Sequence, residues 1–332
     1  MSDRRLPSSL RRRLATLLLA APLARTGAAS ATGAAATAWP TRPVKLLVGF
    51  PGGSSPDMAA RVLAEGLALA WGQPVVVDNR PGAAGNLAAA AVAQARDGHT
   101  LGVVINGNLS SARLLNPKLP FDPATDFSLL SLLATAPLVL VGSASAPGGA
   151  DWFAAARQAA GRWNYGSVGL GSVGHLGMEL LQVRAGFVAT HVPYSGNPAV
   201  VTALIAGQVQ AALVPPGVAL PQVRAGRLRA IGLTGGRSVL APEVPPLSAL
   251  GVPLDELEVW VALVGPAGLT AVAQQRLAQD VPRVLRHADA RQRLFNAGWQ
   301  VQAGAAEALR LRVAAERQLL GGIIASRGIR AE

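Results

Sequence analysis

Apolar runs alternate with amphipathic stretches along most of this chain. Lys45–Phe50 is a short apolar run typical of a buried strand, and Leu63, Leu67 and Ala70 recur at the spacing of one helix face. Pro51-Gly52-Gly53 interrupts the pattern between them. The pattern therefore predicts a strand, a glycine-rich turn and a helix in succession.

Residues that favour a helix start follow this turn. Ser54 or Ser55 is suited to cap the helix, Pro56 fits its first turn, and Asp57 suits the positive end of its dipole. Free amide groups at such a helix start, beyond the end of a strand, form an anion site in open α/β sheets. A tight turn without a ligand is the alternative.

The pattern repeats after this unit. Strands are expected at 74–78 and 101–105 with a helix at 82–94 between them, which makes a βαβαβ unit with parallel strands. Residues 106–126 contain three prolines and are expected to be rich in loops. Residues 131–141 are expected to be extended and split by Pro137.

A second α/β set begins near Asp151. Its expected strands are 163–167, 189–192, 209–214, 228–233 and 258–264, and its expected helices are 152–160, 177–185, 198–206 and 221–225. The tail is expected to form helices at 270–286, 287–297 and 305–325. We expect two lobes with the tail packed on the first, and one helix start from each lobe facing a shared cleft.

The bulk composition narrows the class of protein. The 332 residues are 50% hydrophobic, which excludes a disordered chain, and the absence of cysteine excludes thiol catalysis and Cys-ligated metals. The formal net charge is +12, but the arginines are scattered and aromatic residues do not alternate with them. We therefore expect no nucleic-acid partner, and an acidic ligand is favoured.

The first 38 residues have the pattern of an export signal. Arginine-rich Arg4–Arg13 precedes the apolar run Leu14–Leu23, and small residues follow up to Ala36-Thr37-Ala38. We predict cleavage near Ala38 and an exported mature chain that starts near Trp39. Arg11-Arg12-Arg13 leaves twin-arginine export open beside general secretion.

A second glycine-rich turn lies at Gly169–Gly174 and matches G-x-G-x-x-G. A dinucleotide site also needs an acidic residue about 20 positions later, and none occurs between Glu179 and Glu243. We favour a turn that offers amide groups and the Ser167 and Ser172 hydroxyls to a small anion.

Catalytic and metal chemistry have weaker support. Ser172 lacks the G-x-S-x-G pattern of a nucleophile elbow, although His175 lies three residues on. The four histidines are dispersed, without the spacing of metal ligands. We expect no catalytic residue, no metal and no cofactor. Tyr194 has two open alternatives, a cleft residue or a half-buried loop tyrosine.

Several segments together resemble the Bug/TctC family, the extracytoplasmic solute receptors of tripartite tricarboxylate transporters. The matching pieces include VKLLVGFPGGSSPD, GQPVVVDNRPGAAGN, DGHTL, WNYGSVGLGSVGHLGMELL and HVPYSGNPAVVTALIAGQV. Each is weak alone, but their order and spacing extend over nearly the whole chain from Trp39 to about Ala325.

The resemblance implies a fold class and an organisation. It implies an α/β, two-lobed periplasmic-binding-protein (Venus flytrap, type II) fold, each lobe a mainly parallel sheet flanked by helices. The expected divisions are 1–38 signal peptide, 39–138 with 259–332 as lobe I, and 139–258 as lobe II.

It also implies a function. The chain would capture a small carboxylate (a di- or tricarboxylate or related organic acid) in an interlobe cleft and deliver it to membrane transporter subunits, as a monomer and without catalysis. The predicted ligand-binding residues are Gly52, Gly53, Ser54, Ser55, Asp57, Asn106, Ser167, Gly169, Gly171, Ser172, His175 and Tyr194. Within this set, Asp57 is expected to hold its own loop and His175 to orient the second loop.

The sequence departs from the family pattern at two places. Pro56 stands where the family often has threonine, and Val214-Pro215-Pro216 stands where many members have an Asp-Asn pair. An acidic residue there would pair with a ligand amine, so its absence indicates an amine-free ligand or a member that has drifted.

Two other function classes stay open. One is an exported α/β hydrolase-like enzyme that uses Ser172 and His175. The other is a ligand-sensing adaptor for a sensor kinase.

Overall fold

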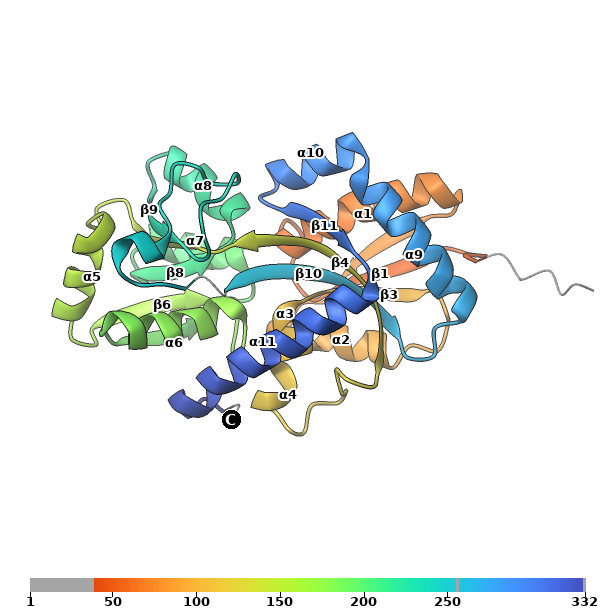
Figure 1. Ribbon diagram of the computed structural model, residues 1–332, viewed down its shortest axis with the longest axis horizontal. Helices are drawn as coiled ribbons and strands as arrows, with labels where there is room; N and C mark the ends of the chain where they lie inside the picture. The colour runs from red at the N-terminus through yellow and green to blue at the C-terminus, as the bar shows by residue number, and fades with distance from the viewer. Residues whose placement is uncertain (1–38, 255–256, 331–332) are drawn as a thin grey trace, which may run out of the picture. The chain divides into compact units, whose positions relative to one another are not determined.

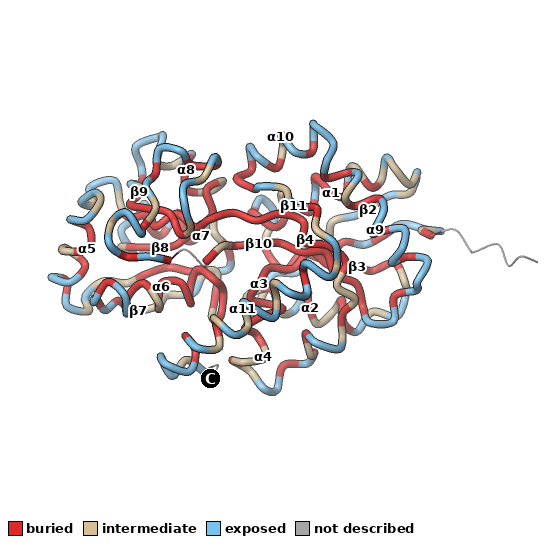
Figure 2. The backbone as a smooth tube through the Cα atoms, in the orientation of Figure 1, coloured by how far each residue is buried: buried red, intermediate tan, exposed pale blue. Residues whose placement is uncertain are grey.

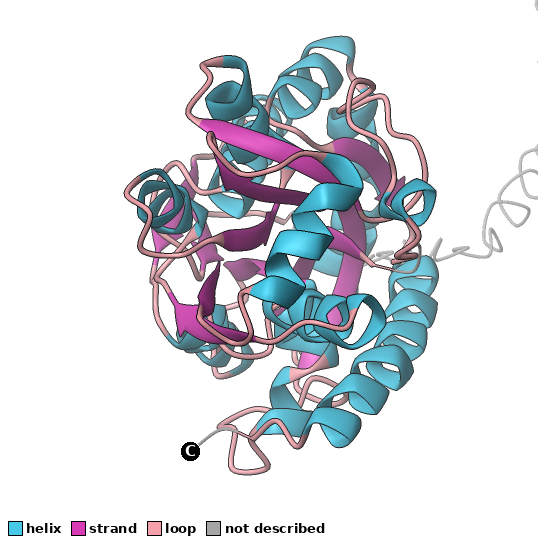
Figure 3. Cartoon of the chain, turned by 90° about the vertical axis from the view of Figure 1, so that its left-hand side faces the viewer, coloured by secondary structure: helices cyan, strands magenta, loops and turns pink. Residues whose placement is uncertain are grey.

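The computed structural model describes residues 39–254 and 257–330. The predicted signal peptide, residues 1–38, lies outside the described residues. Two sheets carry the fold, and helices cover them (Figures 1 and 3). Both sheets are mostly buried, as Figure 2 shows.

The first sheet has the strand order β11-β4-β10-β3-β1-β2. Its strands are β1 Val44–Val48, β2 Val75–Asn79, β3 Thr100–Ile105, β4 Phe127–Pro137, β10 Glu258–Pro266 and β11 Gln300–Gly304. β1 pairs in parallel with β2 and β3, as predicted for the βαβαβ unit.

The second sheet has the order β7-β6-β8-β5-β9. Its strands are β5 Val139–Ser143, β6 Trp163–Ser167, β7 Ala189–Pro193, β8 Ala211–Val214 and β9 Leu228–Leu233. β6 is parallel to β7 and β8, and β5 is antiparallel to β8 and β9.

The α/β, two-sheet class is confirmed, and most strands of each sheet run in one direction, although neither sheet is purely parallel. β10 runs antiparallel to β3 and β4, and β11 runs antiparallel to β4, so both sheets are mixed. The reason is topological. β4 passes into β5 through the single residue Leu138, and β10 returns to the first sheet after the second is complete.

The helices follow the predicted pattern with some differences. They are α1 Ser55–Trp71, α2 Asn86–Ala93, α3 Asn106–Ser110, α4 Ala112–Leu115, α5 Gly149–Gln158, α6 Val173–Ala185, α7 Asn197–Ile205, α8 Pro216–Arg224, α9 Ala271–Arg286, α10 Ala288–Asn296 and α11 Ala306–Arg327. Two short 3₁₀ turns, η1 Ala83–Gly85 and η2 Leu247–Leu250, complete the set. α3 and α4 lie in the segment expected to be loop, and β11 was not predicted.

The tail packs on the first sheet's helices, as expected. Trp71 of α1 donates to Asp280 of α9 at 2.7 Å, and Arg293 of α10 pairs with Glu65 of α1 at 2.7 Å. Because α1 starts at the glycine-rich turn, these contacts fix the direction in which that turn points.

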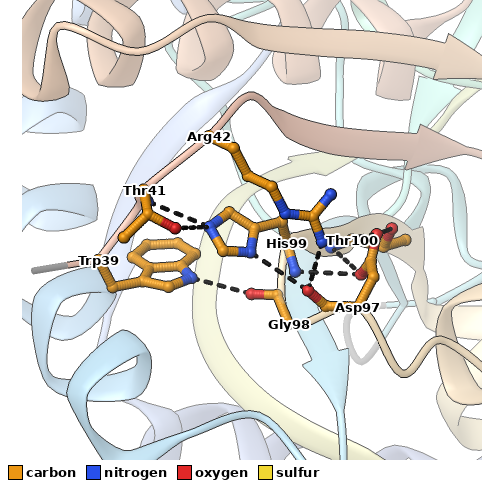
Figure 4. A network of polar contacts seen from close by, with 7 residues as sticks. All are labelled: Trp39, Thr41, Arg42, Asp97, Gly98, His99 and Thr100. Carbon is orange, nitrogen blue, oxygen red and sulfur yellow. Dashed lines mark hydrogen bonds and ion pairs between the residues drawn. The ribbon is translucent and has the colours of Figure 1, made fainter. Parts of the chain in front are cut away.

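The beginning of the described chain is tied to the segment before β3 (Figure 4). The Trp39 indole donates to the Gly98 carbonyl at 2.8 Å, and the Thr41 amide donates to His99 Nε2 at 3.2 Å. Asp97 accepts from the amides of His99 and Thr100. The DGHTL motif therefore holds in place the segment that leads into β1.

Candidate functional site

The turn after β1 buries two serines that have no hydrogen-bond partner. Ser54 precedes α1 as its N-cap residue, and Ser54 and Ser55 are each 1% exposed. Neither hydroxyl finds a partner among the described residues. A buried hydroxyl without a partner costs free energy, so these two groups point to something that occupies the space beside them.

Asp57 holds this turn from within. Its carboxylate accepts hydrogen bonds from the Gly53 amide at 2.8 Å, the Asn79 amide group at 2.8 Å and Arg61 Nε at 2.9 Å. Burial raises the pKa of Asp57, but these hydrogen bonds outweigh burial and leave the pKa below its ordinary value. Asp57 is therefore charged, buried and committed to its own loop.

The second turn runs from β6 to α6 and is held by side chains of its own. Ser172 caps α6 by accepting from the His175 amide at 3.3 Å, and its hydroxyl donates to the Gly169 carbonyl at 2.8 Å. Gly169 and Gly171 have φ values of +123° and +78°, a backbone region that favours glycine. The turn therefore depends on glycines at these two positions.

Two histidines whose rings pack closely at a tilt support the second turn. The rings of His175 and His191 lie 4.1 Å apart between centroids. His175 Nδ1 accepts from the Gly171 amide at 3.2 Å, and His191 Nε2 lies 2.7 Å from the Ser167 hydroxyl. The expected role of His175 in orienting the turn fits this contact, and His191 is a second support that the sequence analysis missed.

Both histidines are neutral at neutral pH. Burial, with repulsion from His191 as a second cause, lowers the pKa of His175 to about 3. Burial also lowers the pKa of His191 to about 4. A neutral ring is required for Nδ1 of His175 to accept the Gly171 hydrogen bond, so geometry and protonation state agree.

A charged network joins this region to the C-terminal helix. The Tyr165 hydroxyl donates to Glu179 at 2.5 Å, and Arg327 Nε of α11 pairs with the other oxygen of Glu179 at 2.7 Å. The Tyr165 ring stacks on His191 with centroids 5.1 Å apart. A helix that begins beside the first sheet therefore stabilises the second turn.

A small cavity of about 30 Å³ lies between the two turns. It is lined by Phe50, Ser54, Ser55, Pro56, Ile105, Leu138, Val168, Ser172, Val173, Gly174, Asn197, Leu213, Pro215, Val259 and Trp299. All of these lie in the described part of the chain, and none is Asp, Glu, Lys, Arg or His. The volume is enough for one or two water molecules or a small polar head group.

Four helices of nine or more residues begin at this cavity. The starts of α1 and α6 line it through Ser54–Pro56 and Ser172–Gly174, and those of α7 and α8 through Asn197 and Pro215. Helix starts carry partial positive charge and unpaired amide groups. Proline stands in the first turn of α1, α7 and α8 but not of α6, whose His175 amide already donates to the Ser172 hydroxyl.

The structure places the predicted site residues in several different positions. Ser54, Ser55 and Ser172 line the cavity. Gly52 and Gly53 are exposed and do not line it, because the chain turns inward only at Ser54. Tyr194 and Gly169 line a neighbouring hollow of about 480 Å³, and Gly171 lines a small void of about 10 Å³.

The remaining predicted residues support the site without lining the cavity. Asp57, Ser167 and His175 hold the turns as described above. Asn106 is 0% exposed, and its amide group donates to Glu316 at 2.7 Å and to the Glu258 carbonyl at 3.2 Å. It was expected to face the cleft, but its neighbour Ile105 is the residue that lines the cavity.

Trp299 is the main cavity residue that the sequence analysis missed. It is 1% exposed, and its indole donates to the Ser55 carbonyl at 3.0 Å. No sequence signal links it to the turn because 244 residues separate the two positions. Only the packing of the tail on α1 brings them together.

The described residues hold no group of three or more His, Asp or Glu side chains suited to a metal ion. No helix within the described ranges combines the length and apolar character needed to cross a membrane.

Ser172 and His175 are close in sequence, but their side chains do not hydrogen-bond to each other. The Ser172 hydroxyl donates to the Gly169 carbonyl and accepts from the His175 backbone amide, whereas the His175 ring accepts from the Gly171 amide.

Comparison with known proteins identifies the relatives of this chain. A family model described as the tripartite tricarboxylate transporter family receptor matches residues 59–329. Protein BugT of Bordetella pertussis is 36% identical over 242 residues, which covers 70% of this chain and 73% of BugT.

Solved structures with the same fold include two from Rhodopseudomonas palustris. One, solved with adipate, has a TM-score of 0.83 and 32% identity, and the match covers 88% of this chain and 99% of that chain. MatC, solved with bound malate, has a TM-score of 0.81 and 30% identity, with 86% and 100% covered.

Proposed function

From the premise that this chain belongs to the tripartite tricarboxylate transporter receptor family, we propose that it captures a small carboxylate between its two sheets. It then delivers the ligand to the membrane subunits of a tripartite transporter. The relatives solved with adipate and malate support a carboxylate ligand.

One observation carries the proposal. Two buried, unpartnered hydroxyls and four helix starts converge on one cavity whose lining has no charged side chain. Hydrogen bonds to an ionised ligand contribute about 1.5–3 kcal/mol each. Such a site binds an anion without a metal ion or an arginine.

We test the proposal with the double variant Ser54→Ala, Ser55→Ala. Without ligand, the variant should be as stable as the native protein or more stable, because two unpaired buried hydroxyls are removed. Its dissociation constants for adipate and malate should rise at least roughly tenfold, as measured by calorimetric titration.

Ser248→Ala is the matched control, since Ser248 is exposed and lies away from the cavity. It should bind like the native protein. If native protein gives no binding heat with any mono-, di- or tricarboxylate at millimolar concentration, the proposal fails.

The cavity chemistry also favours a ligand without an amine. Pro215 lines the cavity, and Asp57, whose carboxylate is occupied by three donors, does not. An ammonium group would find partial positive charge and no carboxylate. Aspartate should therefore bind more weakly than malate, and tight aspartate binding would contradict this part of the proposal.

We further propose that the chain is not an enzyme. The His175 ring is directed to the Gly171 amide, so it does not activate the Ser172 hydroxyl as a general base. Turnover of ester or amide substrates that is lost in Ser172→Ala would contradict this. Capture of a sensor kinase in place of transporter subunits would favour the adaptor alternative.

The lobe boundaries and the location are proposals as well. We place one lobe at 39–138 with 259–332 and the other at 139–258, following the strands that each sheet contains. We also propose a monomer in the periplasm, exported by residues 1–38. Mass measurement of the exported protein tests the predicted start near Trp39.

A further inference from the structure

Three voids lie in a row between the turns of the two sheets. The cavity described above shares Ile105 and Ser172 with the void of about 10 Å³. That void shares Ala84 and Leu170 with the hollow of about 480 Å³, which we call the outer hollow. Val168 lines both the cavity and the outer hollow, so the two spaces adjoin at the second turn.

The outer hollow has an apolar wall. Its larger side chains include Leu87, Leu115, Leu119, Leu170 and Tyr194. All of its lining residues belong to the described part of the chain, and none of them is charged. Leu87 is 57% exposed, which leaves an apolar side chain in water at this wall. A space of this kind gains free energy when an apolar group displaces the water.

The wall on the side of the first sheet is held in a fixed shape. Gly82, Ala83, Ala84 and Gly85 have consecutive positive φ values of 137°, 48°, 53° and 89°. The Asn108 amide group donates to the Ala84 carbonyl at 3.1 Å and fixes this turn against α3. The turn meets the second turn directly, because a Cβ at Gly169 would lie 2.9 Å from Ala84 Cβ.

The two spaces differ in size and in the donors that face them. The cavity has the unpartnered hydroxyls and the helix starts but room for only a few atoms, whereas the outer hollow is about sixteen times larger and has Asn86, Asn116 and Ser195 among mostly apolar residues. A carboxylate head fits the first and a hydrocarbon body fits the second.

We propose, on the basis of the proposed function, that the preferred ligand is an organic acid with an uncharged aliphatic or aromatic body. Its carboxylate lies at the cavity and its body occupies the outer hollow. Each methylene buried there tightens binding by about fourfold.

The experiment is a titration of the whole mature chain with acetate, butyrate, hexanoate, octanoate and malate. We expect affinity to rise with chain length from butyrate to octanoate. Ser195→Trp, at an exposed position on the wall of the outer hollow, should abolish this dependence by filling the space. Ser248→Trp, at an exposed position away from the hollow, should keep it.

The outcomes separate this inference from the proposed function. Tight malate binding without any gain from butyrate to octanoate overturns the inference and leaves the proposed function standing. A chain-length dependence that persists in Ser195→Trp overturns the placement of the body in the outer hollow. Absence of binding by all five acids overturns the inference, and the proposed function falls as well if adipate and the tricarboxylates also fail to bind.

Discussion

Buried polar side chains at this site either bond to their own loop or keep a group free for a ligand, and burial alone does not distinguish these two roles. Ser55 and Asp57 are both 1% exposed and two positions apart. The Asp57 carboxylate is occupied by donors of its own loop, whereas the Ser55 hydroxyl has no partner. The unpaired group is the one available to a ligand.

Asp57→Asn should destabilise the fold. The variant keeps the shape of the side chain but loses the charge that strengthens the hydrogen bonds from Arg61 and the Gly53 amide, at a cost of about 1.5–3 kcal/mol. Urea unfolding at neutral pH measures this. The loss should vanish as the pH falls through the lowered pKa of Asp57, because the native carboxylate is then protonated too.

Asp78→Asn is the control for this variant. Asp78 also pairs with an arginine, Arg80 at 2.9 Å, but the side chains are 36% and 49% exposed. Its loss should cost less than about 1 kcal/mol. If the two variants lower the free energy of unfolding equally, the buried hydrogen bonds of Asp57 stabilise the fold no more than the exposed ion pair of Asp78.

At the scale of elements, the order of strands and helices was predictable, whereas several helix starts and the distant strand pairings were not: α6 and α8 begin at Val173 and Pro216, earlier than the predicted 177 and 221. The predicted strand, turn and helix at the first turn agree with β1 and α1 because capping and φ preferences act within a few residues. β11 was missed because Gln300–Gly304 has only one buried residue and is held by pairing with β4. The antiparallel return of β10 likewise depends on partners far away in the chain.

The close contact between α8 and the segment before β11 allows a second test of how the two turns come together. A Cβ at Gly217, at the start of α8, would lie 1.9 Å from the Ala297 carbonyl oxygen beside β11. Gly217→Ala should therefore disfavour the arrangement in which the two turns meet. The dissociation constant for the carboxylate should rise roughly tenfold or more, since overpacking costs about 1–3 kcal/mol.

Gly236→Ala is the control for this variant. Gly236 has no atom within 4 Å of its Cβ position and should bind as the native protein does. Unchanged affinity in Gly217→Ala would mean that this contact does not take part in binding.

At the scale of the whole molecule, buried histidines set how stability depends on pH. His175 and His191 have pKa values lowered to about 3 and about 4 from an ordinary value of 6.5. Between these values the unfolded chain binds protons that the folded chain does not. The contribution of the two histidines to the free energy of unfolding should therefore fall as the pH decreases from about 6.5 toward about 4, and Glu316, whose pKa burial raises to about 7, offsets part of this fall.

Urea unfolding at several pH values measures this dependence. His191→Gln should reduce its slope, because one titrating group is removed while an acceptor for Ser167 is kept. His287→Gln is the control, since His287 lies outside this cluster and should leave the slope unchanged. A slope that is unchanged in His191→Gln would contradict the buried neutral pair.

The sequence by itself determined the two turns, the helices that start at them and the α/β class. These features arise from glycine, proline, capping residues and apolar spacing, all of which act between near neighbours. Only the tertiary structure decided that Ser54, Ser55 and Ser172 line the cavity while Gly52 and Asn106 do not. It also decided that Trp299 closes the cavity and that the sheets are mixed. Such outcomes depend on contacts between residues a hundred or more positions apart, and no local pattern encodes those contacts.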